Sequence, residues 1–245
     1  MLPAMITVLP NALFNLLTVP VSHKYRMNFS YKTDQGPAQI IMLPGNETSE
    51  KLAARCMASC KAIGQKAEYY PGFDGTSGEI KAPINDSWLS WIKVTDKHLS
   101  ITEVACSLSH ISLWAKCIQQ DRPLIILEHD TIMVKALTTH PVYGVIDYLG
   151  SREQKNGWKV LPTPPHATNG PNYHFMCRAH AYSIDPAVAK NLMSHVIKYG
   201  IHESLDIMIR ADIFPIVQTG FHAYDEPGEI TTITGRKQTP DGKER

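Results

Sequence analysis

Two carboxylates flank a histidine at the end of an apolar segment in the middle of the chain. Residues 124–127 are all apolar, and Glu128-His129-Asp130 follows at once. Four consecutive apolar residues are typical of a central strand that is buried on both faces. Because residues i and i+2 of an extended segment point the same way, Glu128 and Asp130 share one side of the strand end. Two carboxylates there predict a site for Mg²⁺ or Mn²⁺, and the imidazole of His129 favours Mn²⁺. The alternative interpretation is a solvated polar strand end.

A strand–helix–strand unit is predicted upstream of these acidic residues. The mostly apolar residues 39–43 end at Pro44-Gly45 and predict a buried strand, and residues 67–70 resume an extended pattern. Between them, apolar residues at helical spacing lead to Gly64, which predicts the end of a helix. The N-cap of this helix is one of Asn46, Thr48 and Ser49. Such a unit favours a parallel sheet, in which ligands bind beyond the carboxyl ends of the strands.

A long helix is predicted directly before the strand over 124–127. Its apolar positions form one continuous stripe: Val104, Leu108, Ile111, Ala115 and Ile118. Thr102 is the predicted N-cap, and Asp121-Arg122-Pro123 ends the helix. Glu103 lies in the first turn, where a carboxylate favours the helix dipole.

Shorter elements are predicted downstream. Asp185-Pro186 starts a helix that Gly200 ends, with Asp as N-cap and proline in the first position. The other expectations are a short helix over 141–149, a strand over 158–161, an extended segment over 178–184, a short helix over 205–209 and a strand over 213–218. The fold class is therefore α/β, with a mixed, mostly parallel central sheet flanked by helices. We predict an N-terminal extension over 1–38, a single domain over 39–233 and a loose tail over 234–245.

A proline-rich segment over residues 162–174 lies between the acidic residues and the C-terminal elements. Loops of more than about 12 residues in compact domains are usually functional or disordered. We therefore predict a lid that becomes ordered over a bound ligand, with hydrogen-bonding and stacking groups from His166, Asn169, Asn172, Tyr173 and His174. The alternative is a static surface loop that its prolines hold in place.

Composition limits the function classes. The chain has 245 residues, 24 Lys and Arg against 23 Asp and Glu, and a net charge of +1, so no field of one sign attracts nucleic acid or an anionic membrane. The five cysteines are odd in number and contain no C-x-x-C pair, which predicts reduced thiols. The apolar N-terminus is interrupted by prolines and predicts neither a signal peptide nor a membrane span. We expect a cytoplasmic protein, in the host cell if the source is viral.

The segment from Ile101 to Asp130 resembles glycosyltransferase family 25, which includes lipopolysaccharide-type sugar transferases and collagen galactosyltransferases. The matching residues are Glu103, Cys106, Leu108, Ser109, His110, Trp114, Glu128 and Asp130. Weaker similarities lie in the flanks: Arg55 after the first strand, the turn Tyr70-Pro-Gly-Phe-Asp74-Gly75, the segment 181–184 and the pair Leu205-Asp206. The resemblance covers about residues 39–218.

The resemblance implies a GT-A fold, a nucleotide-sugar donor, a divalent metal (Mn²⁺ or Mg²⁺) and inversion at the anomeric carbon. A metal neutralises the leaving diphosphate, and Asp130 is the first candidate ligand. Glu128 is assigned to a hydroxyl of the donor ribose or sugar, or to the metal through water, and His129 is a further candidate ligand. The acceptor hydroxyl needs a general base, for which Asp206 is the leading candidate and Glu203 the alternative. Both could instead be ordinary surface carboxylates.

Four further residues are candidates for donor binding by the same resemblance. His110 contacts the donor or orients Glu128, or is a buried histidine bonded to one carbonyl. Glu103 contacts donor or acceptor, or serves only the helix dipole. Arg55 pairs with the donor phosphates, or is a solvated helix residue, and Asp74 belongs to the family's turn. Trp114 is expected in the core.

The departures from the family pattern leave alternatives open. Thr102 and Ala105 stand where the family usually has glycine, and His129 replaces the central acid of a Glu-Asp-Asp triplet. Loss of that carboxylate lowers metal affinity or shifts metal preference, and it allows an inactive relative that acts as a binding protein. A saccharide is the expected acceptor. A hydroxymethylated base of DNA is the alternative, and would require a basic patch and base flipping.

Overall fold

The computed structural model describes residues 36–137, 146–149, 159–160, 176, 179–210, 213–218 and 222–225. The chain divides into two units, Met1–Thr33 and Asp34–Arg245, and all described residues belong to the second. The predicted lid over 162–174 and the predicted tail over 234–245 lie outside the described residues, as does most of the predicted N-terminal extension. No helix in the described ranges has the length and apolar character needed to cross a membrane.

The predicted strand–helix–strand unit is confirmed. Strand β1 (Ala38–Met42) leads into helix α2 (Glu47–Ala62) and then into strand β2 (Ala67–Pro71), which pairs in parallel with β1. Asn46, one of the three candidate caps, is the N-cap, because its side chain accepts a hydrogen bond from the backbone N–H of Ser49 at 3.0 Å. The carboxyl ends of β1 and β2 therefore lie at the same edge of the sheet.

Helix α3 (Ile101–Gln120) begins two residues earlier than the predicted cap requires. Its N-cap is Ser100, not Thr102. The Ser100 hydroxyl accepts from the backbone N–H of Glu103 at 3.2 Å, and Glu103 Oε2 accepts from the backbone N–H of Ser100 at 2.9 Å. This reciprocal capping box satisfies two backbone donors at once, which a cap at Thr102 would leave without partners. A 3₁₀ helix, η1 (Ser87–Trp91), precedes α3, and strand β3 (Leu124–Leu127) follows it.

Seven strands form the main sheet, in the order β2-β1-β3-β7-β5-β8-β6. The remaining members are β5 (Ile146–Tyr148), β6 (Lys159–Val160), β7 (Ala181–Ile184) and β8 (Ile216–Gln218). Strands β2, β1, β3, β5 and β8 run in one direction, and β7 and β6 run against them, so the sheet is mixed and mostly parallel as predicted. A second sheet pairs β4 (Thr131–Met133) with β9 (Ala223–Asp225).

The elements after β4 match the sequence-based expectations except at β5 and at β9, a strand that was not predicted. Helix α4 (Pro186–Tyr199) has Asp185 as its N-cap and Gly200 as its C-cap, as predicted, and helix α5 (Leu205–Met208) follows. The predicted helix over 141–149 is wrong within its described part, since Ile146–Tyr148 is a strand that pairs with both β7 and β8. The partners of these three residues are distant in sequence, so tertiary pairing decides their conformation.

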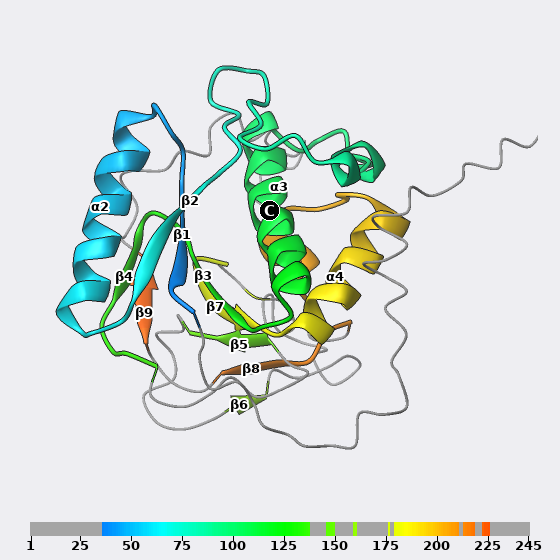
Figure 1. Cartoon of the computed structure of the whole chain (residues 1–245). Helices are drawn as coiled ribbons and strands as arrows, with labels where there is room; N and C mark the ends of the chain where they lie inside the picture. Colours follow the sequence, from blue (N-terminus) through cyan, green and yellow to red (C-terminus); the bar gives the residue numbers. More distant parts are fainter. Residues whose placement is uncertain are drawn as a thin grey trace, which may run out of the picture. The chain divides into compact units, whose positions relative to one another are not determined.

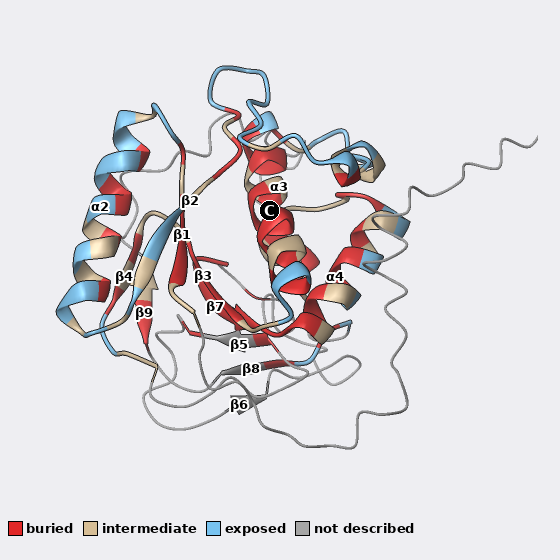
Figure 2. Ribbon diagram, viewed as in Figure 1, coloured by how far each residue is buried: buried red, intermediate tan, exposed pale blue. Residues whose placement is uncertain are grey.

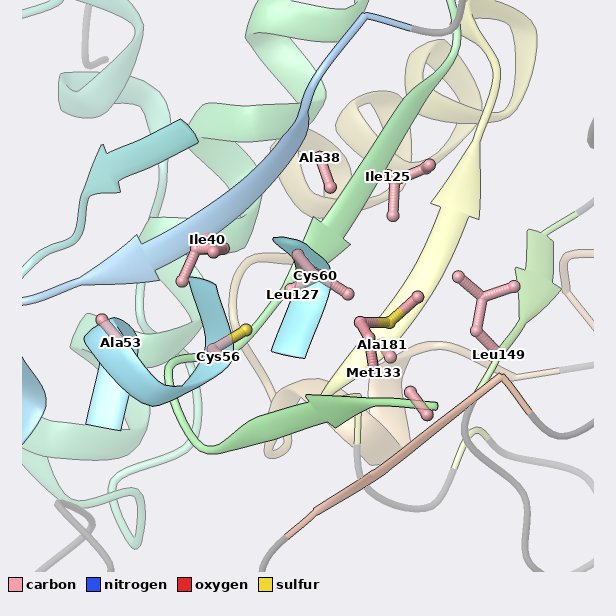
Figure 3. Close-up of a cluster of buried hydrophobic side chains, with 11 residues drawn as sticks. Ala38, Ile40, Ala53, Cys56, Cys60, Ile125, Leu127, Met133, Leu149 and Ala181 are labelled. Atoms are coloured by element: carbon pink, nitrogen blue, oxygen red, sulfur yellow. The ribbon is translucent and has the colours of Figure 1, made fainter. Parts of the chain in front are cut away.

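Helices cover both faces of the main sheet (Figure 1). The register pairs Leu127 with Ala181, and both belong to a buried cluster that includes Ala53, Cys56 and Cys60 of α2 (Figure 3). The next pair along, Ile126 and Tyr182, faces the other side because successive side chains alternate across a strand. Tyr182 there bonds to residues of α3. Strands β3 and β7 are therefore buried on both faces, as Figure 2 shows.

Helix α3 is buried far beyond the predicted apolar stripe. Leu108 and Ala115, two members of that stripe, are only half-buried, whereas Trp114 is fully buried as expected. Polar residues of α3 are also buried: Thr102, Glu103, Ser107, Ser109, His110 and Ser112. Buried polar side chains need hydrogen-bond partners, and the partners of Ser109 and His110 lie at the candidate site.

Candidate active site

A pocket lies where the parallel strands β1, β2 and β3 end and α3 begins. Its lining comes from four segments: Ile41 and Leu43 near the end of β1; Phe73, Gly75 and Thr76 after β2; Thr102, Ala105, Cys106, Ser109 and His110 on α3; and Glu128, His129 and Asp130 after β3. Crevices beyond the carboxyl ends of strands are where open α/β sheets bind ligands. The two carboxylates after the buried strand, Glu128 and Asp130, therefore share one pocket.

The turn that carries Glu128, His129 and Asp130 is held by its backbone. The N–H of Glu128 donates to the carbonyl of His180 at 2.8 Å, and the N–H of Thr131 donates to the carbonyl of Glu128 at 3.1 Å. The Thr131 hydroxyl donates to the same His180 carbonyl at 2.7 Å. Three side chains thus project into the pocket from a short segment pinned at both ends.

Glu128 receives two protein donors on one oxygen. His110 Nε2 lies 3.2 Å from Glu128 Oε1, and the Cys106 thiol donates to the same oxygen at 3.8 Å. Burial acts to raise the pKa of the Glu128 carboxyl, but the hydrogen bond from His110 and the influence of the nearby histidines outweigh it, so the pKa is lowered. Glu128 is therefore ionised, and its side chain remains 29% exposed toward the pocket.

His110 is engaged on both ring nitrogens. Its side chain is fully buried, and Nδ1 lies 2.8 Å from the hydroxyl of Tyr182, whose ring stacks on the imidazole at a centroid distance of 5.6 Å. The indole N–H of Trp114 donates to the same hydroxyl at 3.0 Å. His110 contacts Glu128 and also lines the pocket, so both functional roles expected for it, orientation of Glu128 and contact with the sugar donor, stay predictions.

Tyr182 was not a candidate site residue. His110 and Trp114 are four residues apart on one helical face, which the sequence shows, but Tyr182 lies 72 residues from His110. The signals available were the extended pattern over 178–184 and the family resemblance of the segment 181–184. This segment reveals a polar contact only once β7 is paired with β3.

His129 is tied to the start of α2. Its Nδ1 lies 2.9 Å from the hydroxyl of Ser49, which also accepts the backbone N–H of Leu43 at 2.9 Å. Burial lowers the pKa of His129, and the charge of Glu128 only partly opposes this. With Nδ1 occupied by Ser49, Nε2 is the ring nitrogen left to meet a ligand in the pocket.

The thiol of Cys106 is influenced electrostatically by three carboxylates. Burial, followed by the charges of Glu128, Asp206 and Asp130, raises the pKa of the Cys106 thiol well above its usual value. Asp206 thus lies close enough to influence the same thiol as the acidic triplet, although it is not among the pocket-lining residues. The concentration of negative charge favours a cation at this place.

Two sets of side chains have the chemistry of a metal site. The ligand atoms of Cys106, His110 and Glu128 lie within 4.8 Å of one another. Glu128 and Asp130 form the second set, with His129 between them, and offer the oxygen-rich donors that Mn²⁺ and Mg²⁺ prefer. Cys106 and His110 are already bonded to Glu128 Oε1, so the second set leaves more ligand atoms directed at the pocket.

The two candidate bases lie at and just before the start of α5. The Asp206 carboxylate Oδ1 accepts the Ser204 hydroxyl at 2.8 Å. Helix α5 packs against α3, which carries Cys106. Glu203 is half-buried, and its Oε2 has no hydrogen-bond partner among the described residues.

The other expected donor-binding residues lie outside the pocket lining. Glu103 is buried in the capping box with Ser100, and Asp74 Oδ1 accepts both the backbone N–H and the hydroxyl of Thr76, at 2.8 and 2.7 Å. Arg55 lies on α2 and is half-buried. Glu103 and Asp74 therefore shape two walls of the site, the start of α3 and the loop after β2.

The loop after β2 packs against α3 through contacts that sequence reasoning missed. The Ser109 hydroxyl accepts the backbone N–H of Phe73 at 2.8 Å and donates to the carbonyl of Ala105 at 2.9 Å. A Cβ on Gly75 would lie 2.7 Å from the backbone oxygen of Ile101. Both contacts require a small residue or a hydroxyl at a fixed position, which explains why a serine and a glycine stand there.

Comparison with known proteins agrees with this geometry. The model of Glycosyltransferase family 25 (LPS biosynthesis protein) matches residues 57–141. The matched segment contains the loop after β2, all of α3 and the acidic triplet, and so most of the pocket lining. No curated protein matches the chain.

Proposed function

Because residues 57–141 match the model of glycosyltransferase family 25, a family of sugar-transferring enzymes, we propose that the protein is a metal-dependent inverting glycosyltransferase. Its substrates are a nucleotide-sugar donor and an acceptor hydroxyl on a saccharide. The observation that carries the proposal is the position of Glu128, His129 and Asp130 together in one pocket beyond the carboxyl ends of parallel strands.

The ligand atoms that these side chains offer fit a divalent cation such as Mn²⁺ or Mg²⁺. Asp130 is the proposed ligand, and Glu128 is either a second ligand through water or the acceptor of a donor hydroxyl. His129 Nε2 is available beside them. When bound, the ion supplies positive charge to the leaving diphosphate.

The protein's own groups perform the remaining tasks. Helix α3 directs its N-terminal half at the pocket, where the partial positive charge of the helix favours an anionic ligand. Asp206 is the proposed general base, which takes the proton of the acceptor hydroxyl as that oxygen attacks the anomeric carbon from the side opposite the leaving group. Its electrostatic effect on Cys106 supports a place near the acidic triplet. Glu203, three residues earlier, is the alternative base.

A donor screen tests the proposal. The purified chain is incubated with a panel of nucleotide sugars, with Mn²⁺ or with a chelator, and released nucleoside diphosphate is measured. We expect hydrolysis of at least one donor that depends on the metal. Mass spectrometry of candidate saccharides incubated with that donor then identifies the acceptor.

A matched pair of variants assigns the metal ligand. Asp130→Asn removes a proposed ligand charge, whereas Asp121→Asn makes the same change at the exposed C-cap of α3, where φ is 48° and asparagine is tolerated. We expect Mn²⁺-dependent thermal stabilisation by a nucleoside diphosphate to be lost in the first variant and kept in the second. Equal stabilisation in both contradicts the assignment of Asp130. Donor binding without turnover by the unmodified chain indicates a binding protein.

A further inference from the structure

We propose that Tyr182 and Trp114 are positioning residues that control which oxygen of Glu128 meets the ligand. This inference rests on the proposed function, because it concerns the same pocket. It starts from four groups joined in one chain of contacts: Trp114, Tyr182, His110 and Glu128. The first three are fully buried; His110 and Glu128 both line the pocket, and of the four only Glu128 is partly exposed.

The direction of the hydrogen bonds along this series of contacts is set by Trp114, the group at its buried end. An indole N–H can only donate, so the Tyr182 oxygen accepts from Trp114 at 3.0 Å. Tyr182 then has its own proton to place. Among the described residues, its remaining hydrogen-bond partner is His110 Nδ1 at 2.8 Å. Tyr182 therefore donates to Nδ1, and the ring proton of His110 lies on Nε2.

The opposite arrangement leaves two groups unsatisfied. With a proton on Nδ1, the Tyr182 oxygen would accept from both His110 and Trp114, and its own buried proton would have no described partner. In the neutral ring, the lone pair of Nε2 would then face the Glu128 carboxylate oxygen at 3.2 Å. A buried donor without a partner costs more than a hydrogen bond returns. The tautomer with Nε2–H satisfies every member of the chain.

The consequence appears at Glu128. Its Oε1 accepts from His110 Nε2 and from the Cys106 thiol, so both protein donors converge on one oxygen. Oε2 has no hydrogen-bond partner among the described residues. Glu128 therefore presents one oriented oxygen, Oε2, to the ligand. Through that atom it accepts a hydrogen bond from one hydroxyl of the nucleotide sugar, or coordinates one cation.

The test removes one hydroxyl from this series of hydrogen-bonded side chains. Tyr182→Phe keeps the ring that stacks on His110 but deprives Nδ1 of its donor. The readout is ¹⁵N NMR of protein labelled at histidine, with the His110 signals identified as those lost in His110→Gln. We expect an unprotonated Nδ1 and a protonated Nε2 in the unmodified protein, and a mixture of both tautomers in Tyr182→Phe. Donor hydrolysis should fall about five- to tenfold in kcat/KM, the usual effect of one hydrogen bond.

Tyr70→Phe is the matched control. The Tyr70 hydroxyl interacts with Ser112, not with His110, so this variant loses a hydroxyl outside the chain. We expect the His110 tautomer and kcat/KM to stay unchanged in it. Protonated Nδ1 in the unmodified protein overturns the proposal, as does an unchanged tautomer in Tyr182→Phe. If no nucleotide sugar is hydrolysed, the proposed function fails, while the NMR spectrum of the unmodified chain still decides the tautomer.

Discussion

Gly75→Ala perturbs the pocket through a single added methyl group. The Cβ would lie 2.7 Å from the backbone oxygen of Ile101 and 3.0 Å from the Cα of Thr102, at the start of α3. Neither atom can rotate away, because both belong to the backbone. Gly75 is not among the glycines with positive φ, so the cost comes from space alone. Either the loop after β2 or the first turn of α3 has to move.

The size of that movement follows from the contact distance. Ordinary contact begins at 3.4 Å, so the two segments must separate by about 0.7 Å. Overpacking of this kind costs about 1–3 kcal/mol, and each kcal/mol lowers the Tm of a domain this size by about 2–4 °C. Since a displacement of about 1 Å can cost about 10²-fold in rate, we expect a fall of about tenfold in kcat/KM.

Gly64→Ala separates the two effects. Gly64 has φ +75° and open space around a Cβ, and follows α2 at the end away from the pocket. Alanine there costs about 1–2 kcal/mol through its backbone conformation. We measure Tm by thermal unfolding, and kcat/KM by hydrolysis of the donor found in the screen. Both variants should lower Tm, and only Gly75→Ala should lower kcat/KM. Equal kcat/KM in the two variants would refute the packing argument.

Three further outcomes are expected. Asp206→Asn leaves binding of the nucleoside diphosphate nearly unchanged but lowers turnover by about 10²-fold, the scale of a lost general base, and a loss of only a few-fold would transfer that role to Glu203. His129→Asp restores the triplet usual in the family and keeps or raises activity with Mg²⁺; metal-dependence curves that lose Mg²⁺ activity would refute this. Because burial and nearby carboxylates raise the pKa of Cys106, its alkylation by iodoacetamide at about pH 8 should be far slower than that of a free thiol, as mass spectrometry can follow.

Elements with strong local signals were predictable. Apolar runs, caps and helical spacing identified β1, α2, β3 and α4, because those signals lie within each segment. The start of α3 was predictable but missed, since Ser100 and Glu103 carry the spacing of a capping box. The strand β5 was not predictable, because three residues offer little local signal and its partners come from β7 and β8.

The candidate site divides in the same way. The acidic triplet and its place after a buried strand are local properties, so the sequence by itself determined the carboxylates at the pocket. The order of the strands brought Tyr182 to His110, and packing of α3 on that face added Trp114. Which nitrogen of His110 carries the proton, and which oxygen of Glu128 faces the ligand, follows only from those contacts. The direction of these hydrogen bonds depends on side chains from α3, from β7 and from the turn after β3. Only the tertiary structure decided how those three segments meet.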